Sequence, residues 1–254
     1  MNSFLSYLGG KSRLTDKIIP LIPDHTCYCE VFAGAAWMLF RKPESKTEIL
    51  NDINKDLITL YRVVKYHLDE FVRYFRWALV SRDEFDRLRS VPPDTLTDIQ
   101  RAARFYYLLK AGFGGKIKGP IFSSAPSSPP RLNLLRMEED LSTAHLRLAR
   151  VYIENLPYGT LITRHDRPAT FFYLDPPYYG CEKDYGNGLF GREDFATLRG
   201  ILDGIKGKFI LSINDRPEIR ETYKGFKMRS VGTSYSATKT GSKGDIRELL
   251  ITNY

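Results

Sequence analysis

The stretch FFYLDPPYYG, residues 171–180, decides the fold of this 254-residue chain. Its first four residues are apolar or aromatic, which is typical of a strand buried inside a sheet. The chain then becomes charged at Asp175 and stiff at Pro176 and Pro177. In open α/β sheets, ligands bind beyond the C-terminal ends of the strands. The stretch therefore predicts a buried strand over residues 171–174 that ends at a binding site.

The residues after this strand favour an active site over a plain Pro-Pro turn. Asp175 and Pro176 each precede a proline, so both are biased toward extended backbone. Because prolines lack an N–H, the Asp175 carboxylate and the Pro176 carbonyl form a stiff pair of acceptors beside the Tyr178 ring. A planar amine that donates two hydrogens and stacks on a ring, such as the exocyclic amine of a nucleobase, suits this arrangement. A turn with incidental tyrosines is the alternative, and it leaves Asp175 without a partner.

Strands and helices alternate around this segment. The apolar patterns predict helices near residues 55–79, 98–112, 138–148 and 193–205, and strands at 26–32, 47–52, 150–155, 170–175, 208–215, 226–232 and 247–253. Such alternation predicts an α/β fold with a mostly parallel sheet. No helix separates the last two strands, so we expect them to form an antiparallel hairpin.

Residues 56–149 differ from the rest, because they are mainly helical and contain a long loop over residues 112–136. Between Asp98 and Glu138 the chain has no acidic residue, although it has several Lys and Arg interleaved with aromatic residues. A solvated loop is the alternative, but charge of one sign with aromatic residues favours a nucleic-acid surface. We therefore expect one domain from residues 1–55 and 150–254, with residues 56–149 inserted as a second unit.

The composition restricts the class of protein. A formal net charge of +8 favours a polyanionic partner such as nucleic acid. An odd number of cysteines without framework spacing indicates a reducing compartment, and no Cys or His pair has the spacing of a metal site. The chain has no signal-peptide pattern and no apolar run of the ~20 residues that a membrane helix needs. We expect a cytoplasmic protein that holds no metal and contacts no membrane.

Two further polar signals stand at predicted strand ends. Glu30 begins EVFAGAA, residues 30–36, where small residues let the backbone approach a ligand at the start of a helix. Asp52 follows about 20 residues later, and an acid at this spacing commonly accepts hydrogen bonds from a ribose. Together they predict a cofactor that contains a nucleoside, with a plain tight turn as the alternative for residues 30–36. The absence of GxGxxG argues against NAD.

The N-terminal YLGGKS, residues 7–12, ends like a phosphate-binding loop. That motif requires a glycine where this chain has Leu5, and no strand precedes it. A P-loop ATPase is therefore disfavoured.

Four motifs occur in one order along the chain: YLGGK at 7–11, EVFAGAA at 30–36, NDIN at 51–54 and DPPY at 175–178. With them the whole chain resembles the S-adenosylmethionine-dependent DNA adenine methyltransferases of the Dam (D12) type. The resemblance implies a Rossmann-like methyltransferase sheet with an inserted target-recognition domain. It also implies S-adenosyl-L-methionine as cofactor, S-adenosyl-L-homocysteine as product, and double-stranded DNA as partner. The location it implies is the nucleoid of a prokaryotic or phage-infected cell.

The motif positions carry the implied roles. The resemblance implies a catalytic set of Asp175, Pro176, Pro177 and Tyr178. It implies a cofactor-binding set of Tyr7, Gly10, Lys11, Glu30, Phe32, Gly34, Asp52 and Asp175. The basic and aromatic residues expected to contact DNA are Arg104, Lys110, Phe113, Lys116, Lys118 and Arg131.

The chain departs from the family pattern in three places. Val31 and Ala36 stand where the family usually has Pro and Gly, and Phe113-Gly114-Gly115 replaces an aromatic-Asn-Gly stretch. The last change leaves the recognition sequence open.

In the implied mechanism the target adenine flips out of the duplex, at a cost of about a few kcal/mol. Asp175 and the Pro176 carbonyl would accept hydrogen bonds from its amine, and Tyr178 would stack on its ring. The alternatives are a cytosine-N4 or RNA amino-methyltransferase, and a non-catalytic DNA-binding relative. The sequence decides neither between monomer and homodimer nor whether a cognate restriction enzyme exists.

Overall fold

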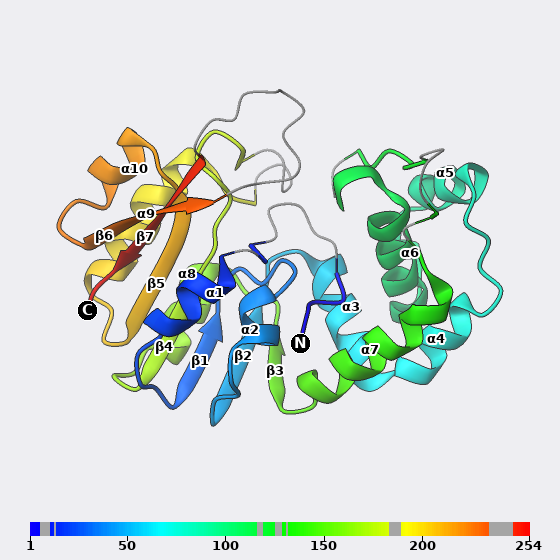
Figure 1. The fold of residues 1–254 in the computed structure, drawn as a ribbon, viewed down its shortest axis with the longest axis horizontal. Helices are drawn as coiled ribbons and strands as arrows, with labels where there is room; N and C mark the ends of the chain where they lie inside the picture. Colours follow the sequence, from blue (N-terminus) through cyan, green and yellow to red (C-terminus); the bar gives the residue numbers. More distant parts are fainter. Residues whose placement is uncertain are drawn as a thin grey trace.

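A computed structural model describes residues 1–5, 11–12, 14–115, 119–124, 129–130, 132–182, 189–233 and 246–254. Its centre is a seven-stranded sheet with the order β3-β2-β1-β4-β5-β7-β6 (Figure 1). The strands are β1 Cys27–Glu30, β2 Thr47–Asn51, β3 Val151–Glu154, β4 Thr170–Leu174, β5 Lys208–Asn214, β6 Lys227–Thr233 and β7 Ile246–Thr252. All of them were expected from the apolar patterns, with ends that differ by one or a few residues.

The strand directions confirm the predicted sheet. Strands β3, β2, β1, β4 and β5 run parallel to one another. Strand β7 pairs antiparallel with both β5 and β6, as expected for two strands without a helix between them. In this register Glu248 of β7 lies opposite Asn214 of β5.

Apolar layers cover both faces of the sheet because successive strand residues point to opposite sides. On one face, strand residues such as Tyr28 and Phe171 share a core with α1 Thr15–Ile18, α2 Trp37–Arg41 and α3 Lys55–Tyr66. On the other face, strand residues such as Cys29 and Phe172 pack with α8 Tyr158–His165, α9 Arg192–Asp203 and α10 Pro217–Thr222. Strand β4 is buried along its whole length, as its sequence predicts.

Helices α3 to α7 lie together beside the sheet, on the right in Figure 1. After α3, they are α4 Leu68–Phe75, α5 Arg82–Ser90, α6 Asp98–Ala111 and α7 Leu134–Leu148. They fall within residues 55–148, close to the predicted insert of 56–149. Its action as a separate recognition unit stays a prediction.

The single helix expected over residues 55–79 is wrong, because the chain forms two helices that meet at His67. This residue has φ −137° and ψ 39°, outside the helical region. Asp69 and Glu70 occupy the first turn of α4, where acidic side chains stabilise a new helix N-terminus. The apolar spacing continues across the break and therefore conceals it.

Four of the described helices were not predicted from the sequence patterns: α1, α5, α8 and α10. Helix α5 buries only Phe85 and Leu88, so its sequence shows little apolar periodicity, but the Ser81 side chain accepts a hydrogen bond from the Glu84 N–H and caps its start. The long loop expected over 112–136 is also shorter, because α7 begins at Leu134. The remaining short elements are 3-10 turns, η1 Ile19–Leu21, η2 Pro93–Thr95 and η3 Phe113–Gly115.

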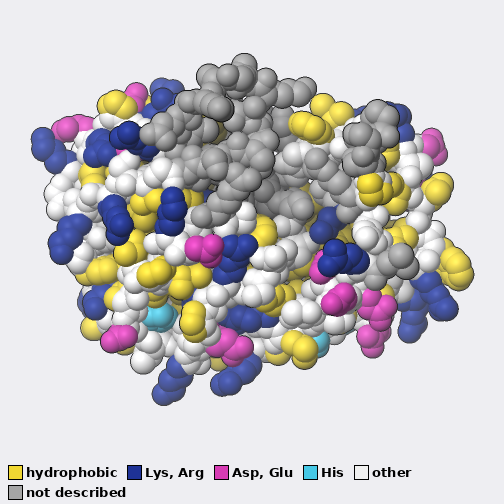
Figure 2. Space-filling model, in the orientation of Figure 1, with side chains coloured by type: hydrophobic (Ala, Val, Ile, Leu, Met, Phe, Trp, Pro, Cys, Tyr) yellow, Lys and Arg dark blue, Asp and Glu magenta, His cyan; other side chains and the backbone are white. Residues whose placement is uncertain are grey.

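In Figure 2, Lys and Arg side chains are denser on the left half of the visible face, over α10, β6 and β7. The exposed ones on these elements and beside them are Arg216, Arg220, Lys224, Lys227, Arg229 and Arg247. The basic excess is therefore not confined to the inserted residues. Among the described residues, no helix is long and apolar enough to cross a membrane.

Candidate active site

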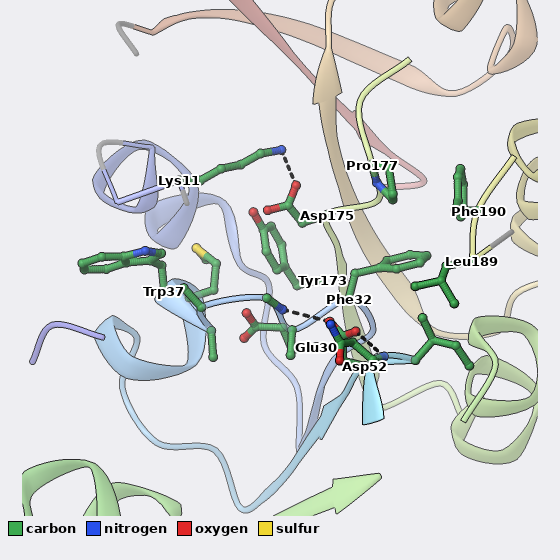
Figure 3. A pocket seen from close by; sticks show the side chains of 17 residues that line it. Lys11, Glu30, Phe32, Trp37, Asp52, Tyr173, Asp175, Pro177, Leu189 and Phe190 are labelled. Carbon is green, nitrogen blue, oxygen red and sulfur yellow. Dashed lines mark hydrogen bonds and ion pairs between the residues drawn. The ribbon is translucent and has the colours of Figure 1, made fainter. Parts of the chain in front are cut away.

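Three acidic residues lie around one cleft at the carboxyl ends of neighbouring strands. Glu30 is the last residue of β1, Asp52 follows β2, and Asp175 follows β4. Parallel strands end at the same edge of a sheet, so residues far apart in sequence meet there. The cleft encloses about 780 Å³, part of it open to solvent, and Figure 3 shows the side chains that line it. Lys11, Phe32 and Gly34 also line this cleft, as the motifs led us to expect.

The turn after β1 has a left-handed backbone at two positions. Gly34 has φ 47°, and Ala36, at the N-cap of α2, has φ 52° and ψ 37°. A residue with a Cβ disfavours this region by roughly 1–2 kcal/mol. This explains why the family motif usually has glycine at the position of Ala36. Ala36 adopts the same left-handed turn, but its Cβ makes the turn less stable.

Asp52 ties this turn to the end of β2. Its carboxylate accepts hydrogen bonds from the Gly34 N–H (3.0 Å) and the Asn54 N–H (2.9 Å). The Tyr61 hydroxyl donates to the Gly34 carbonyl (2.8 Å) and holds the turn from the other side. Burial raises the pKa of Asp52, against the opposing effect of these backbone donors. The carboxylate is therefore fixed in place at the wall of the cleft.

Asp175 forms an ion pair with Lys11, whose Nζ lies 2.6 Å from its Oδ1. Lys11 is buried, and its ammonium also donates to the Ser212 carbonyl (2.8 Å) and to Glu248. Burial disfavours the Lys11 charge, but the two carboxylates outweigh it and raise its pKa. Burial raises the pKa of Asp175 to about 6, although Lys11 opposes that shift. A carboxylate with this pKa is ionised at neutral pH and protonated in mild acid.

Glu248 was not expected at the site. It is fully buried in β7, and its carboxylate accepts hydrogen bonds from the Ser212 hydroxyl (2.8 Å) and the Tyr178 hydroxyl (2.7 Å), as well as from Lys11. A sequence signal existed, because an acid stands inside the strand expected over 247–253. Its partners could not be read from the sequence, since they come from three distant segments.

The two tyrosines of DPPYYG have different surroundings. Lys11 Nζ lies 5.0 Å from the centre of the Tyr178 ring, and Pro177 lines the cleft beside it. Tyr179 packs its ring on Phe195, with the ring centres 5.5 Å apart. Asn214 holds the Tyr179 backbone, accepting from its N–H (2.9 Å) and donating to its carbonyl (3.0 Å). Tyr179 is thus a packing residue that anchors the segment.

Glu30 is almost completely buried at the floor of the cleft. Its carboxylate accepts hydrogen bonds from the Tyr28 hydroxyl (2.7 Å) and the Leu39 N–H (2.9 Å). Burial raises the pKa of Glu30 to about 8 despite these donors. The side chain is therefore mostly protonated at pH 7, and a cation in the cleft would favour its ionised form.

The cleft has two chemically different ends. Lys11, Glu30 and Asp175 gather at one end, while Phe32, Leu189 and Phe190 form an apolar wall at the other (Figure 3). The Tyr173 hydroxyl is buried between the charged groups. It makes no hydrogen bond of standard geometry with the described residues, although the Ser212 side chain is near enough to oppose the rise in its pKa that burial causes. A ligand with a polar group at this end would supply a better partner. A ligand with an aromatic ring at one end and charged amino-acid groups at the other fits these residues.

The residues expected to contact DNA are only partly described. Lys116, Lys118 and Arg131 lie outside the described residues, as do Tyr7 and Gly10 of the first motif. Phe113 is 48% exposed immediately after α6. The Arg104 guanidinium donates to the Leu88 carbonyl (2.7 Å) at the end of α5, and Lys110 Nζ lies 5.4 Å from the Tyr106 ring. Arg104 and Lys110 thus have partners within the insert, and their DNA contacts stay predictions.

The sequence profile of the D12 class N6 adenine-specific DNA methyltransferases matches residues 7–237, nearly the whole chain. The chain belongs to this family. Three related proteins match this D12 methyltransferase along almost their full length. The Type II methyltransferase M.CviBI of Paramecium bursaria Chlorella virus NC1A is 24% identical and covers all of both chains. The Type II methyltransferase M1.LlaDCHI of Lactococcus lactis subsp. cremoris is 26% identical, over all of this chain and 96% of the relative. The DNA adenine methylase of Escherichia coli K12 is 28% identical, over 98% of this chain and 94% of the relative.

Membership in the family defines the activity of this D12 methyltransferase as site-specific methylation of adenine in DNA. A methyltransferase of this family uses a methyl donor, and DNA is its substrate. Each of the four motifs contributes a charged residue to the lining of this cleft. These residues are Lys11, Glu30, Asp52 and Asp175.

Proposed function

We propose that this chain transfers the methyl group of S-adenosyl-L-methionine to N6 of an adenine that is flipped out of double-stranded DNA, and releases S-adenosyl-L-homocysteine. The observation that carries the proposal is the shared cleft of Asp52 and Asp175. One acid suits a ribose and the other suits an amine, and both face the same space.

The residues present fit the cofactor. Phe32 would contact its adenine, Asp52 would accept hydrogen bonds from its ribose hydroxyls, and Lys11 and Glu30 would hold its charged amino-acid end. The buried Tyr173 hydroxyl supports this assignment, since Tyr173 lines the cleft and its hydroxyl makes no hydrogen bond of standard geometry with the described residues. When bound, S-adenosyl-L-methionine supplies an electrophilic methyl group on a sulfonium sulfur. Tyr7 and Gly10 belong to the same proposal through their motif.

Asp175 would act on the target base. Its ionised carboxylate and the Pro176 carbonyl accept hydrogen bonds from the two N–H groups of the adenine amine, which directs the nitrogen lone pair for in-line attack. The N–C bond would form as the S–C bond breaks, and the methylated nitrogen would then release one proton to water. Pro177 keeps the segment stiff, and Tyr178 offers a ring for the flipped base to stack on. This catalysis consists of positioning and preorganised electrostatics, so no covalent intermediate with the protein is needed.

The inserted helices would read the DNA. Lys116, Lys118 and Arg131 would contact phosphates or guanine edges, together with Arg104 and Lys110, and Phe113 would contact bases. The exposed basic side chains near β6 and β7 support a long, electrostatic DNA surface. Two of the three relatives above are bacterial, which supports action on nucleoid DNA in the cytoplasm.

A methyl-transfer assay with methyl-labelled cofactor tests the proposal. We expect wild type to label duplex DNA at adenine N6, to bind the cofactor, and to leave RNA of the same sequence unlabelled. Asp175→Ala should reduce labelling by at least a hundredfold while it retains DNA binding. Asp203→Ala, which removes an exposed acid of α9, is the matched control and should keep full activity.

The nucleoside that carries the label decides the outcome. Label on cytosine N4, label on RNA, or normal turnover in Asp175→Ala would refute the proposal. Tight duplex binding without any transfer would instead indicate a non-catalytic relative.

A further inference from the structure

Glu248 connects three segments of the active site through one buried carboxylate. One oxygen accepts from Lys11 and from the Ser212 hydroxyl (2.8 Å), and the other accepts from the Tyr178 hydroxyl (2.7 Å). These partners come from the N-terminal segment, from β5 and from the segment after β4. Glu248 itself is 0% exposed.

The charges explain what such a carboxylate adds. Lys11 is the partner of both Asp175 and Glu248, so one positive charge lies between two negative ones. Without Glu248, the Lys11 ammonium would pair with Asp175 alone and would compete more strongly with the adenine amine for the Asp175 oxygens. With Glu248 present, the Lys11 ammonium is shared between two carboxylates, so less of its charge is directed at Asp175.

The position of Glu248 in the sheet strengthens the geometric argument. It lies on β7 opposite Asn214 of β5, and Asn214 holds the backbone of Tyr179 through two hydrogen bonds. These neighbouring polar residues of the antiparallel pair therefore hold Tyr178 and Tyr179 in succession. The segment after Asp175 is thus held in place by two strands that lie outside the four motifs.

We propose that Glu248 is a positioning residue for methyl transfer: it holds Lys11 and Tyr178 in place so that the Asp175 carboxylate stays oriented and available as an acceptor for the target amine. This inference rests on the proposed function of Asp175. Glu248 is fully buried and does not line the cleft, so it acts through Lys11 and Tyr178.

The test compares Glu248→Gln with Glu218→Gln, which makes the same change at an exposed acid of α10. Glutamine keeps the size of the side chain but loses its charge. Removing charge-assisted hydrogen bonds should slow the single-turnover methylation rate by roughly 10- to 100-fold. The KM for DNA and the cofactor affinity should change by less than about threefold, because Glu248 does not line the cleft.

Two readouts separate positioning from a merely structural role. Loss of the Glu248 charge should move the acidic midpoint of the rate to lower pH, because that charge raises the pKa of Asp175. In a Lys11→Met background the effect of Glu248→Gln should shrink, since the carboxylate has lost a partner through which it acts. If Glu248→Gln does not fold, Tyr178→Phe removes one partner of the same carboxylate and should still slow the rate by about threefold to tenfold.

Wild-type labelling of adenine is measured first, and its absence would overturn both the proposed function and this inference. With active wild type, the inference alone fails if folded Glu248→Gln matches Glu218→Gln in rate and pH midpoint. It also fails if the effects of Glu248→Gln and Lys11→Met on the free energy of activation are additive. Where Tyr178→Phe replaces an unfolded Glu248→Gln, the inference fails if Tyr178→Phe keeps the full methylation rate.

Discussion

Lowering the pH should switch off methyl transfer through Asp175. The pKa of this buried carboxyl is raised to about 6, so its ionised acceptor form predominates only above that pH. From pH 7 to pH 5 the ionised fraction falls from about 90% to about 10%, and each further unit lowers it about tenfold. We therefore expect the single-turnover rate to fall about tenfold between pH 7 and pH 5, and about a hundredfold by pH 4.

Replacing Lys11 should move this profile in a known direction. The Lys11 charge lowers the pKa of Asp175, so Lys11→Met should raise the midpoint and leave less activity at neutral pH. The sign is opposite to that expected for Glu248→Gln, whose lost negative charge lowers the midpoint. Opposite shifts from two buried neighbours of one carboxyl are hard to obtain from a general loss of stability.

The assay is a single-turnover reaction with saturating cofactor at constant ionic strength from pH 4 to pH 9. DNA anisotropy and a thermal melt at each pH report binding and folding, and rates are taken only where both are intact. A flat rate between pH 5 and pH 8 would refute the reasoning. So would an unchanged midpoint in folded Lys11→Met.

Three other predictions concern stability, protons and salt. Ala36→Gly should raise the free energy of unfolding in urea by about 0.5–1 kcal/mol, because φ is 52° at this position, whereas Ala35→Gly should lower it by a similar amount. A change of the same sign in both variants would contradict backbone strain at Ala36. Cofactor binding at pH 7 should release close to one proton from Glu30, measured by calorimetry in buffers of different ionisation enthalpy, and Glu30→Gln should abolish the release. DNA affinity should fall steeply with salt concentration, and the double substitution Lys116→Gln with Lys118→Gln should lower the slope of log Kd against log salt concentration by roughly 2. A wild-type Kd that does not change with salt, or a slope that the double substitution leaves unchanged, would exclude phosphate contacts by these lysines.

The sheet could be predicted from the sequence because its strands are short apolar runs that end in polar residues. Asp52 and Asp175 stand at such ends, and parallel pairing brings them together. The break at His67 could not be predicted, since the apolar spacing runs through it. Helix α5 could not be predicted for a different reason: it buries only two residues, so its sequence shows little apolar periodicity.

Part of the site was also out of reach of sequence reasoning. Glu248 gains its partners through the antiparallel pairing of β7 with β5, a contact between residues far apart in the chain. The charge of Arg104 predicts a DNA contact, which stays a prediction, but the hydrogen bonds from its guanidinium to carbonyls at the end of α5 could not be read from the sequence. Motifs locate the chemistry, whereas the partners that tune each charge depend on tertiary packing.

The most direct measurement is mass analysis of nucleosides from the DNA of a host that lacks adenine methylation and expresses this chain. We predict N6-methyladenine in DNA from cells with wild type, at defined sequence sites, and none with Asp175→Ala expressed at the same level. N4-methylcytosine in place of N6-methyladenine would contradict the account, as would equal N6-methyladenine from wild type and Asp175→Ala.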